Sequence, residues 1–205
     1  MKRCLFWGFN LCGSESPLLA AKSTKPWQPG IPRSLLRGFL LMCVVVDINA
    51  LCFVFGEDAH GLFAPIKNWI TNGNGFFVFG GDKYIQELYK TQKYVKIIRL
   101  LNDKGRVRII KKDVVNRKES ELRMKIGCSD CDDHHIIAIL DSSGCRLLCS
   151  VDKRSFRFVK DRTNYTDNKR PKIYSGIRQT KLVEFLERDG CNLKNIDRST
   201  FPVEK

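Results

Sequence analysis

The chain has 205 residues, of which 43% are hydrophobic and 28% are charged, and this composition excludes a disordered chain. The 36 Lys and Arg residues outnumber the 22 Asp and Glu residues, and the net charge of +14 favours a polyanionic partner such as nucleic acid. The nine cysteines are odd in number and scattered, and three of them lie within apolar runs: Cys43, Cys52 and Cys149. This pattern excludes a small disulfide scaffold and favours a reducing, cytoplasmic compartment.

The first 41 residues differ from the rest of the chain. They carry six basic residues, one acid, several Gly, Ser and Pro residues and little periodicity, so we expect a poorly ordered extension over residues 1–41. We expect a globular domain over residues 42–165. A basic C-terminal arm follows over residues 166–205, and its segment 180–190 has the pattern of an amphipathic helix.

One stretch, residues 35–55, has nearly the length of a membrane span. Asp47 and Asn49 lie in its middle, however, and a buried aspartate costs roughly 2.5 to 3.5 kcal/mol in a membrane helix. The valine run before Asp47 and the aromatic residues after it are more typical of a buried strand that leads into a turn and a helix. We therefore expect no membrane partner.

From residue 42 onward, strand and helix patterns alternate. Continuous apolar runs predict strands at 43–47, 76–81, 106–110 and 145–152. Helical spacing of apolar residues predicts helices within 58–73, 82–105 (as two helices), 112–125 and 132–144. Gly144 suits the residue after the end of the last of these helices. This alternation predicts an α/β fold around a mainly parallel sheet.

Acidic residues from four distant segments fall where predicted strands end or helices run: Asp47, Glu87, Asp133 and Asp152. Each has an ordinary alternative, since Asp47 and Asp152 could cap the segments after them and Glu87 could be solvated. Together they predict one site, because ligands bind outside the carboxyl ends of parallel strands. Two carboxylates about 4 Å apart repel by roughly 4 kcal/mol, so such a site needs Mg²⁺ or Mn²⁺.

The stretch CSDCDDHHIIAIL at residues 128–140 allows two interpretations. Cys128 and Cys131 with His134 and His135 could bind zinc, but neighbouring histidines point to different faces of a helix. In the alternative, the helix begins at this point with Asp132 as its N-cap, and the neighbouring carboxylate belongs to the acidic site.

Four segments, VVVDINAL, GGDKYIQEL, CDDHHIIAIL and RLLCSVDKRSF, resemble in order the acidic motifs of PIN-domain nucleases. Their acids are separated by 40, 46 and 19 residues. In the third motif Asp133 fits better than its neighbour, because it precedes Ala138 by five residues. Ser150 stands where the family has threonine, and Asn49 matches the polar residue after the first acid. The resemblance covers residues 42–161.

This resemblance implies a three-layer α/β/α sandwich and metal-dependent hydrolysis of phosphodiester bonds in RNA. The acids Asp47, Glu87, Asp133 and Asp152 would hold one or two Mg²⁺ or Mn²⁺ ions, which activate water for in-line attack. The remaining positions would orient the acids or the water: Asn49, Asp132 and Ser150. Many bacterial members of the family are toxins that pair with an antitoxin protein, so a toxin–antitoxin role is one expectation for this chain.

A basic segment follows the last acid directly. Residues 153–172 hold eight Lys or Arg residues against two acids, interleaved with Phe156, Phe158 and Tyr165. Contacts to phosphates and stacking on bases would position single-stranded RNA, and the expected RNA-binding residues are Lys153, Arg154, Arg157 and Lys160. In the alternative, this is a solvated face whose two phenylalanines belong to the core.

Three functions follow from these patterns. The first is a metal-dependent endoribonuclease. The second is a PIN-like RNA-binding protein without catalysis, and the third is a zinc-binding interaction module. RNA is the expected partner in the first two, and an antitoxin protein and a second copy of the chain, as a homodimer, are further candidate partners.

Overall fold

In a computed structural model of the chain, the structure describes residues 42–56, 61–73, 75–127, 131–176, 193–197 and 201. The expected extension at 1–41, the expected helix at 180–190 and Cys128 lie outside the described residues.

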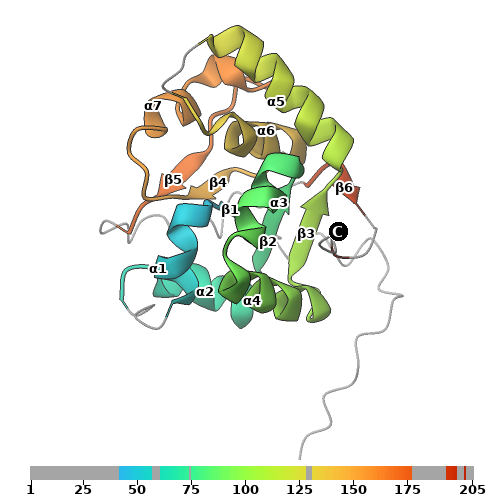
Figure 1. Cartoon of the computed structure of the whole chain (residues 1–205). Coiled ribbons are helices and arrows are strands. Elements are labelled where there is room, and N and C mark those ends of the chain that lie inside the picture. Colours follow the sequence, from blue (N-terminus) through green and yellow to red (C-terminus); the bar gives the residue numbers. More distant parts are fainter. Residues whose placement is uncertain are drawn as a thin grey trace, which may run out of the picture. The chain divides into compact units, whose positions relative to one another are not determined.

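The centre of the fold is a six-stranded sheet in the order β5-β4-β1-β2-β3-β6 (Figure 1). Its strands are β1 (Met42–Val46), β2 (Gly75–Gly80), β3 (Val107–Ile110), β4 (Leu147–Cys149), β5 (Lys172–Tyr174) and β6 (Ile196–Asp197). All neighbouring pairs are parallel except β3 and β6. The predicted α/β class and the mainly parallel sheet are therefore confirmed.

Helices cover both faces of the sheet, an arrangement compatible with a three-layer sandwich (Figure 1). Helix α6 contacts β1, β2 and β3, and α5 packs on the outside of α6. Helix α2 contacts β2, and α4 contacts β3. The helical elements are η2 (Ile48–Ala50), α1 (Leu51–Phe55), α2 (Ala64–Thr71), α3 (Asp82–Tyr89), α4 (Gln92–Asp103), α5 (Lys112–Ile126), α6 (His134–Ser143), α7 (Phe156–Val159) and η3 (Arg162–Asn164).

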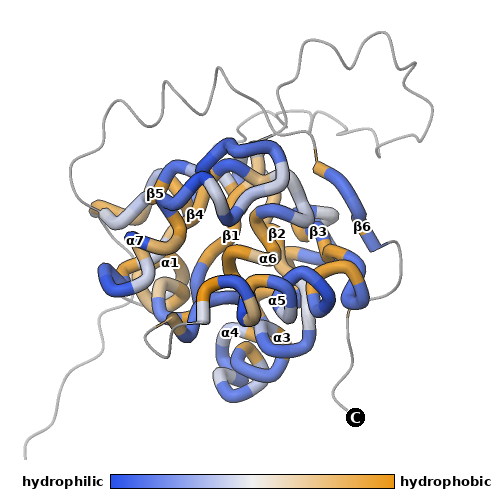
Figure 2. Tube along the Cα trace, turned by 90° about the horizontal axis from the view of Figure 1, so that it is seen from above, coloured by the Kyte–Doolittle hydropathy of each residue, from blue (hydrophilic) through white to orange (hydrophobic). Residues whose placement is uncertain are grey.

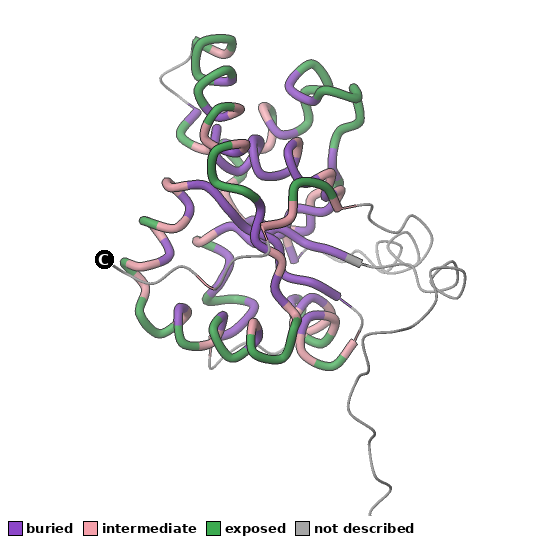
Figure 3. The backbone as a smooth tube through the Cα atoms, turned by 90° about the vertical axis from the view of Figure 1, so that its right-hand side faces the viewer, coloured by how far each residue is buried: buried purple, intermediate pink, exposed green. Residues whose placement is uncertain are grey.

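The apolar runs of the sequence became the buried centre of the sheet. All six residues of β2 are buried, and Val45 and Val46 of β1 are fully inaccessible. Such strands lack apolar–polar alternation because helices cover both of their faces. Figure 2 shows the apolar strands at the centre, and Figure 3 shows the exposed residues gathered on the outer helices.

Helix α6 is buried almost all round because it lies between the sheet and α5. It ends at Gly144, which has a φ of 72°, and the amide of Gly144 donates to the carbonyl of Leu140 at 3.0 Å. The predicted glycine cap is confirmed, since a left-handed residue is needed here and glycine adopts it without a steric cost.

The chain crosses the sheet in a way that creates a ligand-binding position. It runs from β1 through β2 to β3 and then returns past β1 to form β4 on the other side. The direction of winding therefore reverses between β1 and β4, and open α/β sheets bind ligands beyond the carboxyl ends of the strands at such a point.

Two strands were not predicted. Both β5, of three residues, and β6, of two, come from the segment expected to be a basic arm, so the sheet extends beyond residue 165. Elements this short carry no periodic pattern, and pairing with β4 and β3 alone defines them. Within 58–73, the helix α2 begins only at Ala64.

The cysteines differ from the expectation that all three in apolar runs behave as small buried residues. Cys149 is a free and fully buried thiol, but Cys52 is free and exposed on α1, and Cys43 is disulfide-bonded. Of these three cysteines, the expectation holds for Cys149, which is both reduced and buried. No helix within the described residues is long and apolar enough to cross a membrane.

Candidate functional site

A pocket of about 410 Å³ opens at the carboxyl ends of β1 and β4. The four acids singled out in the sequence all line it: Asp47, Glu87, Asp133 and Asp152. The remaining lining residues are Ile48, Asn49, Lys90, Thr91, Asp132, Arg154 and Ser155. The lining thus contains five carboxylates and two cationic side chains, and the structure brings together side chains that lie up to 108 residues apart.

Asp47 is the most enclosed of these acids, with only 4% of its surface exposed. Its backbone amide donates to the carbonyl of Cys149 at 2.9 Å, which joins the ends of β1 and β4. Ser150 donates its hydroxyl to Oδ2 of Asp47 at 2.8 Å, and the amide of Asn49 donates to Oδ1 at 3.3 Å. The carboxylate is therefore fixed in direction by two donors.

Burial raises the pKa of the Asp47 carboxyl above its ordinary value. The hydrogen bond from Ser150 opposes this shift, and the negative charge of Asp133 adds to it. Asp47 also caps η2, which was the ordinary alternative that the sequence allowed for this acid. The same side chain therefore both caps η2 and lines the pocket. Asn49 acts on Asp47 through its backbone amide.

Asp152 is held by its neighbour Arg154. Nη2 of Arg154 lies 2.7 Å from Oδ2, Nε lies 3.1 Å from Oδ1, and the backbone amide of Arg154 donates to Oδ1 at 3.0 Å. These hydrogen bonds keep the pKa of Asp152 below its ordinary value. The amide of Asp152 donates to the hydroxyl of Ser150 at 3.2 Å, so Ser150 links two of the pocket acids.

Glu87 extends from α3 toward a buried histidine of α6. Nε2 of His135 lies 3.4 Å from Oε2 of Glu87, a distance at the long limit for a hydrogen bond. Contact with His135 lowers the pKa of Glu87, and burial partly opposes this change. The position of α3 is fixed by Tyr84, whose hydroxyl donates to the carbonyl of Val46 at 2.6 Å, beside Asp47.

Helix α6 begins one residue later than predicted. Asp133, and not Asp132, occupies the N-cap position, and its side chain accepts no capping hydrogen bond. The carboxylate of Asp133 lines the pocket instead, and its carbonyl accepts the first helical hydrogen bond, from Ile136, at 3.0 Å. The predicted N-cap role of Asp132 is therefore wrong. Its carbonyl accepts a hydrogen bond from Lys83 at 2.6 Å, which ties this turn to α3.

Sequence reasoning missed the positive rim of the pocket. Lys90 and Thr91 lie at the junction of α3 and α4, one turn after Glu87, and both line the pocket. Their closeness to Glu87 along the chain, three and four residues after it, was the available signal. Ser155 also lines the pocket and donates its hydroxyl to the carbonyl of Asp152 at 3.0 Å.

The donor set suits a hard divalent cation, because Mg²⁺ and Mn²⁺ prefer carboxylate oxygens and keep several waters. In the observed side-chain positions, no three His, Cys, Asp or Glu residues of the described part are grouped closely enough to hold a metal. Two of the acids have partners within the protein, since Asp152 is turned onto Arg154 and Glu87 onto His135.

The two histidines of α6 are core residues. His134 and His135 are 5% and 2% exposed, and burial lowers the pKa of His134. His134 lies in the electrostatic neighbourhood of Arg123 and Glu119 of α5, whereas His135 faces Glu87. These side chains point to different surroundings, as expected for neighbours on a helix. The described residues thus give a zinc site no grouped ligands.

The basic segment after β4 is partly surface and partly core. Lys153, Arg157 and Lys160 are exposed, as is Arg154 at the pocket. Arg157 lies over the ring of Phe158 with its Cζ 4.5 Å from the ring centroid. Phe158 is half-buried against the core, and Phe156 is half-buried with the Lys160 ammonium 5.7 Å from its ring centroid.

Tyr165 does not offer a stacking surface for a base. Only 3% of it is exposed, and its hydroxyl donates to the carbonyl of Val159 at 2.8 Å. The expectation that its ring stacks on RNA is therefore wrong, because the ring is enclosed in the fold and its hydroxyl is bonded to the end of α7.

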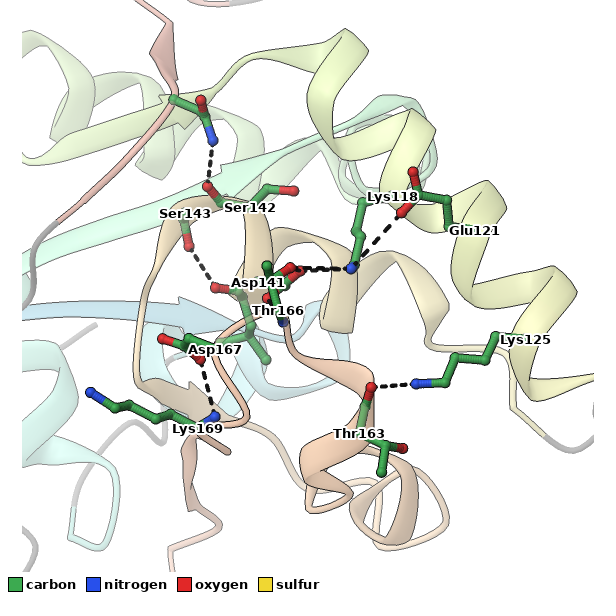
Figure 4. A network of polar contacts seen from close by, with 12 residues as sticks. Lys118, Glu121, Lys125, Asp141, Ser142, Ser143, Thr163, Thr166, Asp167 and Lys169 are labelled. Atoms are coloured by element: carbon green, nitrogen blue, oxygen red, sulfur yellow. Dashed lines mark hydrogen bonds and ion pairs between the residues drawn. The ribbon is translucent and has the colours of Figure 1, made fainter.

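A polar network attaches the end of the basic segment to α5 and α6 (Figure 4). Asp141 of α6 accepts hydrogen bonds from both the amide and the hydroxyl of Thr166 at 2.8 Å, and Lys118 of α5 lies 2.9 Å from the same carboxylate. Lys125 donates to the carbonyl of Thr163. These contacts give the basic segment a fixed position beside the pocket.

Comparisons with protein-family models, curated proteins and solved structures found no significant match.

Proposed function

We propose that the chain is a Mg²⁺- or Mn²⁺-dependent endoribonuclease with a PIN-like version of the α/β fold. The observation that supports this most is the convergence of Asp47, Glu87, Asp133 and Asp152 on one pocket. They come from four separate segments and meet where β1 and β4 end, and an uncompensated cluster of this kind is unfavourable.

The side chains in and behind the pocket have different roles in the proposed reaction. Asp47, Glu87, Asp133 and Asp152 would hold the cation, and a bound divalent cation supplies activation of water and stabilisation of charge on the phosphate. Ser150 holds Asp47 in one direction through the hydrogen bond of 2.8 Å. On the rim, Lys90 and Arg154 are placed to attract a phosphate of the substrate.

RNA as the substrate is supported by charge. The chain carries a net charge of +14, and exposed cations at Lys153, Arg157 and Lys160 follow the pocket residue Asp152 along the chain. Half-buried aromatic rings between these cations, at Phe156 and Phe158, add surfaces for stacking. We place the protein in the cytoplasm, where single-stranded RNA is available, and cell fractionation tests this placement.

A second function is favoured by one observation. Asp152 is neutralised by Arg154, and Glu87 lies against His135, so two of the four acids already have partners within the protein. A PIN-like protein that binds RNA without cleaving it would keep these contacts permanently. Such a protein would bind RNA equally well in EDTA and in Mg²⁺ and would cleave it in neither.

The deciding experiment is cleavage of labelled single-stranded RNA with Mg²⁺, with Mn²⁺ and with EDTA. The nuclease proposal expects cleavage with either metal, none with EDTA, and a loss in Asp47→Asn that exceeds the roughly 10- to 100-fold effect of residues behind metal ligands. Asp103→Asn, which removes an exposed acid at the end of α4, is the matched control and should cleave normally. Metal-independent cleavage, or full activity of Asp47→Asn, would refute the proposal.

The stability of Asp47→Asn separates a catalytic from a structural role. Asp47→Asn loses one of two acceptor oxygens, but it also removes a charge that burial disfavours, so it should lower the free energy of unfolding by no more than about 1.5 kcal/mol at neutral pH. The toxin–antitoxin role extends the same proposal. It expects growth arrest on expression of the wild type, no arrest with Asp47→Asn, and relief by a protein partner that is encoded beside the gene.

Size-exclusion chromatography with light scattering tests the expected homodimer.

A further inference from the structure

An arginine is already hydrogen-bonded to one of the five carboxylates that line the pocket. Arg154 donates to Asp152 three times, with Nη2 at 2.7 Å from Oδ2 and with Nε and the backbone amide at 3.1 Å and 3.0 Å from Oδ1. A carboxylate offers about four lone-pair sites. Two of the three donors fill Oδ1, so a cation that binds Asp152 through Oδ1 or through both oxygens has to displace part of this arrangement.

We propose that Arg154 and a divalent cation compete for Asp152, so that Arg154 sets the affinity of the pocket for metal. This inference rests on the proposed function, because it takes the pocket carboxylates as the ligands of the cation. It makes Arg154 a residue that regulates occupancy of the site through Asp152, in addition to the phosphate contact expected from its charge.

The exposure of the two side chains permits the exchange. The Arg154 side chain is 83% exposed, so its guanidinium can leave Asp152 for water without crossing a packed region. Asp152 is only 16% exposed, and its backbone is held because its amide donates to Ser150 and its carbonyl accepts from Ser155. The backbone that carries this carboxylate is therefore held, and the exposed arginine side chain is the more mobile partner.

Asp152 is also the pocket acid with the strongest internal competitor. Asp47 accepts from a neutral hydroxyl and a backbone amide, and Glu87 faces His135 at the longer distance of 3.4 Å. Arg154 instead presents a permanent positive charge in a forked geometry that matches a carboxylate. Removal of this charge should therefore change metal binding more than any other single substitution of a cation near the pocket.

The test is calorimetric titration of Mn²⁺ into the full-length wild type, Arg154→Gln and Arg157→Gln. Arg157 is the matched control: it carries the same charge three residues further on, lies over the Phe158 ring and does not line the pocket. Arg154→Gln should bind Mn²⁺ tighter by on the order of fivefold, the strength of an exposed ion pair, and Arg157→Gln should stay within about twofold of wild type.

The outcomes separate this inference from the proposed function. If Arg154→Gln binds Mn²⁺ as the wild type does or more weakly, or if both arginine variants gain equally, competition by Arg154 is overturned and the metal site stands. If no variant binds Mn²⁺, both proposals fall. In a direct second measurement, the NMR signal of the Arg154 Nε–H group should move toward that of a solvated arginine as Mg²⁺ saturates the protein. An unchanged signal at saturation overturns the exchange.

Discussion

Substitution of Ser150 by alanine tests how the protein holds its buried carboxylate. The hydroxyl of Ser150, which is 1% exposed, donates to Asp47 at 2.8 Å and accepts from the amide of Asp152 at 3.2 Å. A hydrogen bond to a charged group contributes about 1.5 to 3 kcal/mol, and the longer backbone bond adds about 0.5 kcal/mol. We therefore expect Ser150→Ala to lower the free energy of unfolding by about 2 to 3.5 kcal/mol at neutral pH.

The loss should depend on pH in a known direction. The Ser150 hydrogen bond favours the ionised form of Asp47, whereas burial raises the pKa of this carboxyl above its ordinary value. The stabilisation from Ser150 is therefore fully present above the folded-state pKa of Asp47 and is lost as the pH falls through it. Urea unfolding of wild type and variant, followed by circular dichroism from neutral pH to about pH 4, should show the difference shrinking toward acid.

Ser143 provides a control with the same geometry and no charge. It is completely buried, its hydroxyl donates to the carbonyl of Leu140 at 3.3 Å, and it accepts from the amide of Cys145 at 3.0 Å. Ser143→Ala should cost about 1 to 2 kcal/mol, equally at every pH in this range. Equal losses in the two variants, or a loss in Ser150→Ala that does not change with pH, would refute the account of Asp47.

Two further predictions concern the frame around the pocket. Lys118→Met leaves Asp141, whose side chain is 7% exposed, without the cation that contacts it, and should lower the free energy of unfolding by about 1 to 2 kcal/mol in the same urea assay. Lys125→Met removes an exposed hydrogen bond to the carbonyl of Thr163 and should lower the free energy of unfolding by less than about 1 kcal/mol. Gly81→Ala should lower the free energy of unfolding clearly more than Gly105→Ala does. Both glycines have positive φ, but an added Cβ at Gly81 would lie 2.6 Å from a methyl group of Val115, whereas at Gly105 it would face open space. Gly105→Ala should cost about 1 to 2 kcal/mol in a thermal or urea transition, and equal losses would show that the packing before α3 is looser than described.

The larger elements were predictable because their signals are local. The valine run at 44–46 and the aromatic run at 76–79 are continuous apolar stretches of strand length, and helical spacing marked α3, α4 and α5. The glycine at 144 marked the end of α6 for the same reason. In contrast, β5 and β6 have too few residues for a pattern, and only their pairing with β4 and β3 defines them.

The candidate site shows the same division. Each acid could be named from its place beside a strand or in a helix, because the carboxyl ends of parallel strands share one edge of the sheet. The cap of α6 was misplaced by one residue, since Asp132 and Asp133 are both good caps and the sequence offers no choice between them. The burial of Tyr165 was missed because it depends on tertiary packing, in which its hydroxyl bonds to the carbonyl of Val159 at the end of α7.

The sequence by itself determined the class of fold, the apolar strands and the four acids that line the pocket. Only the tertiary structure decided what each acid contacts: Ser150 reaches Asp47 across 103 residues, His135 faces Glu87, and Arg154 turns back onto Asp152. The physical reason is the separation along the chain over which each kind of interaction acts. Periodicity and caps act within a few residues, whereas the partner and pKa of a carboxylate depend on the strand order and on side-chain directions that exist only after the sheet has formed.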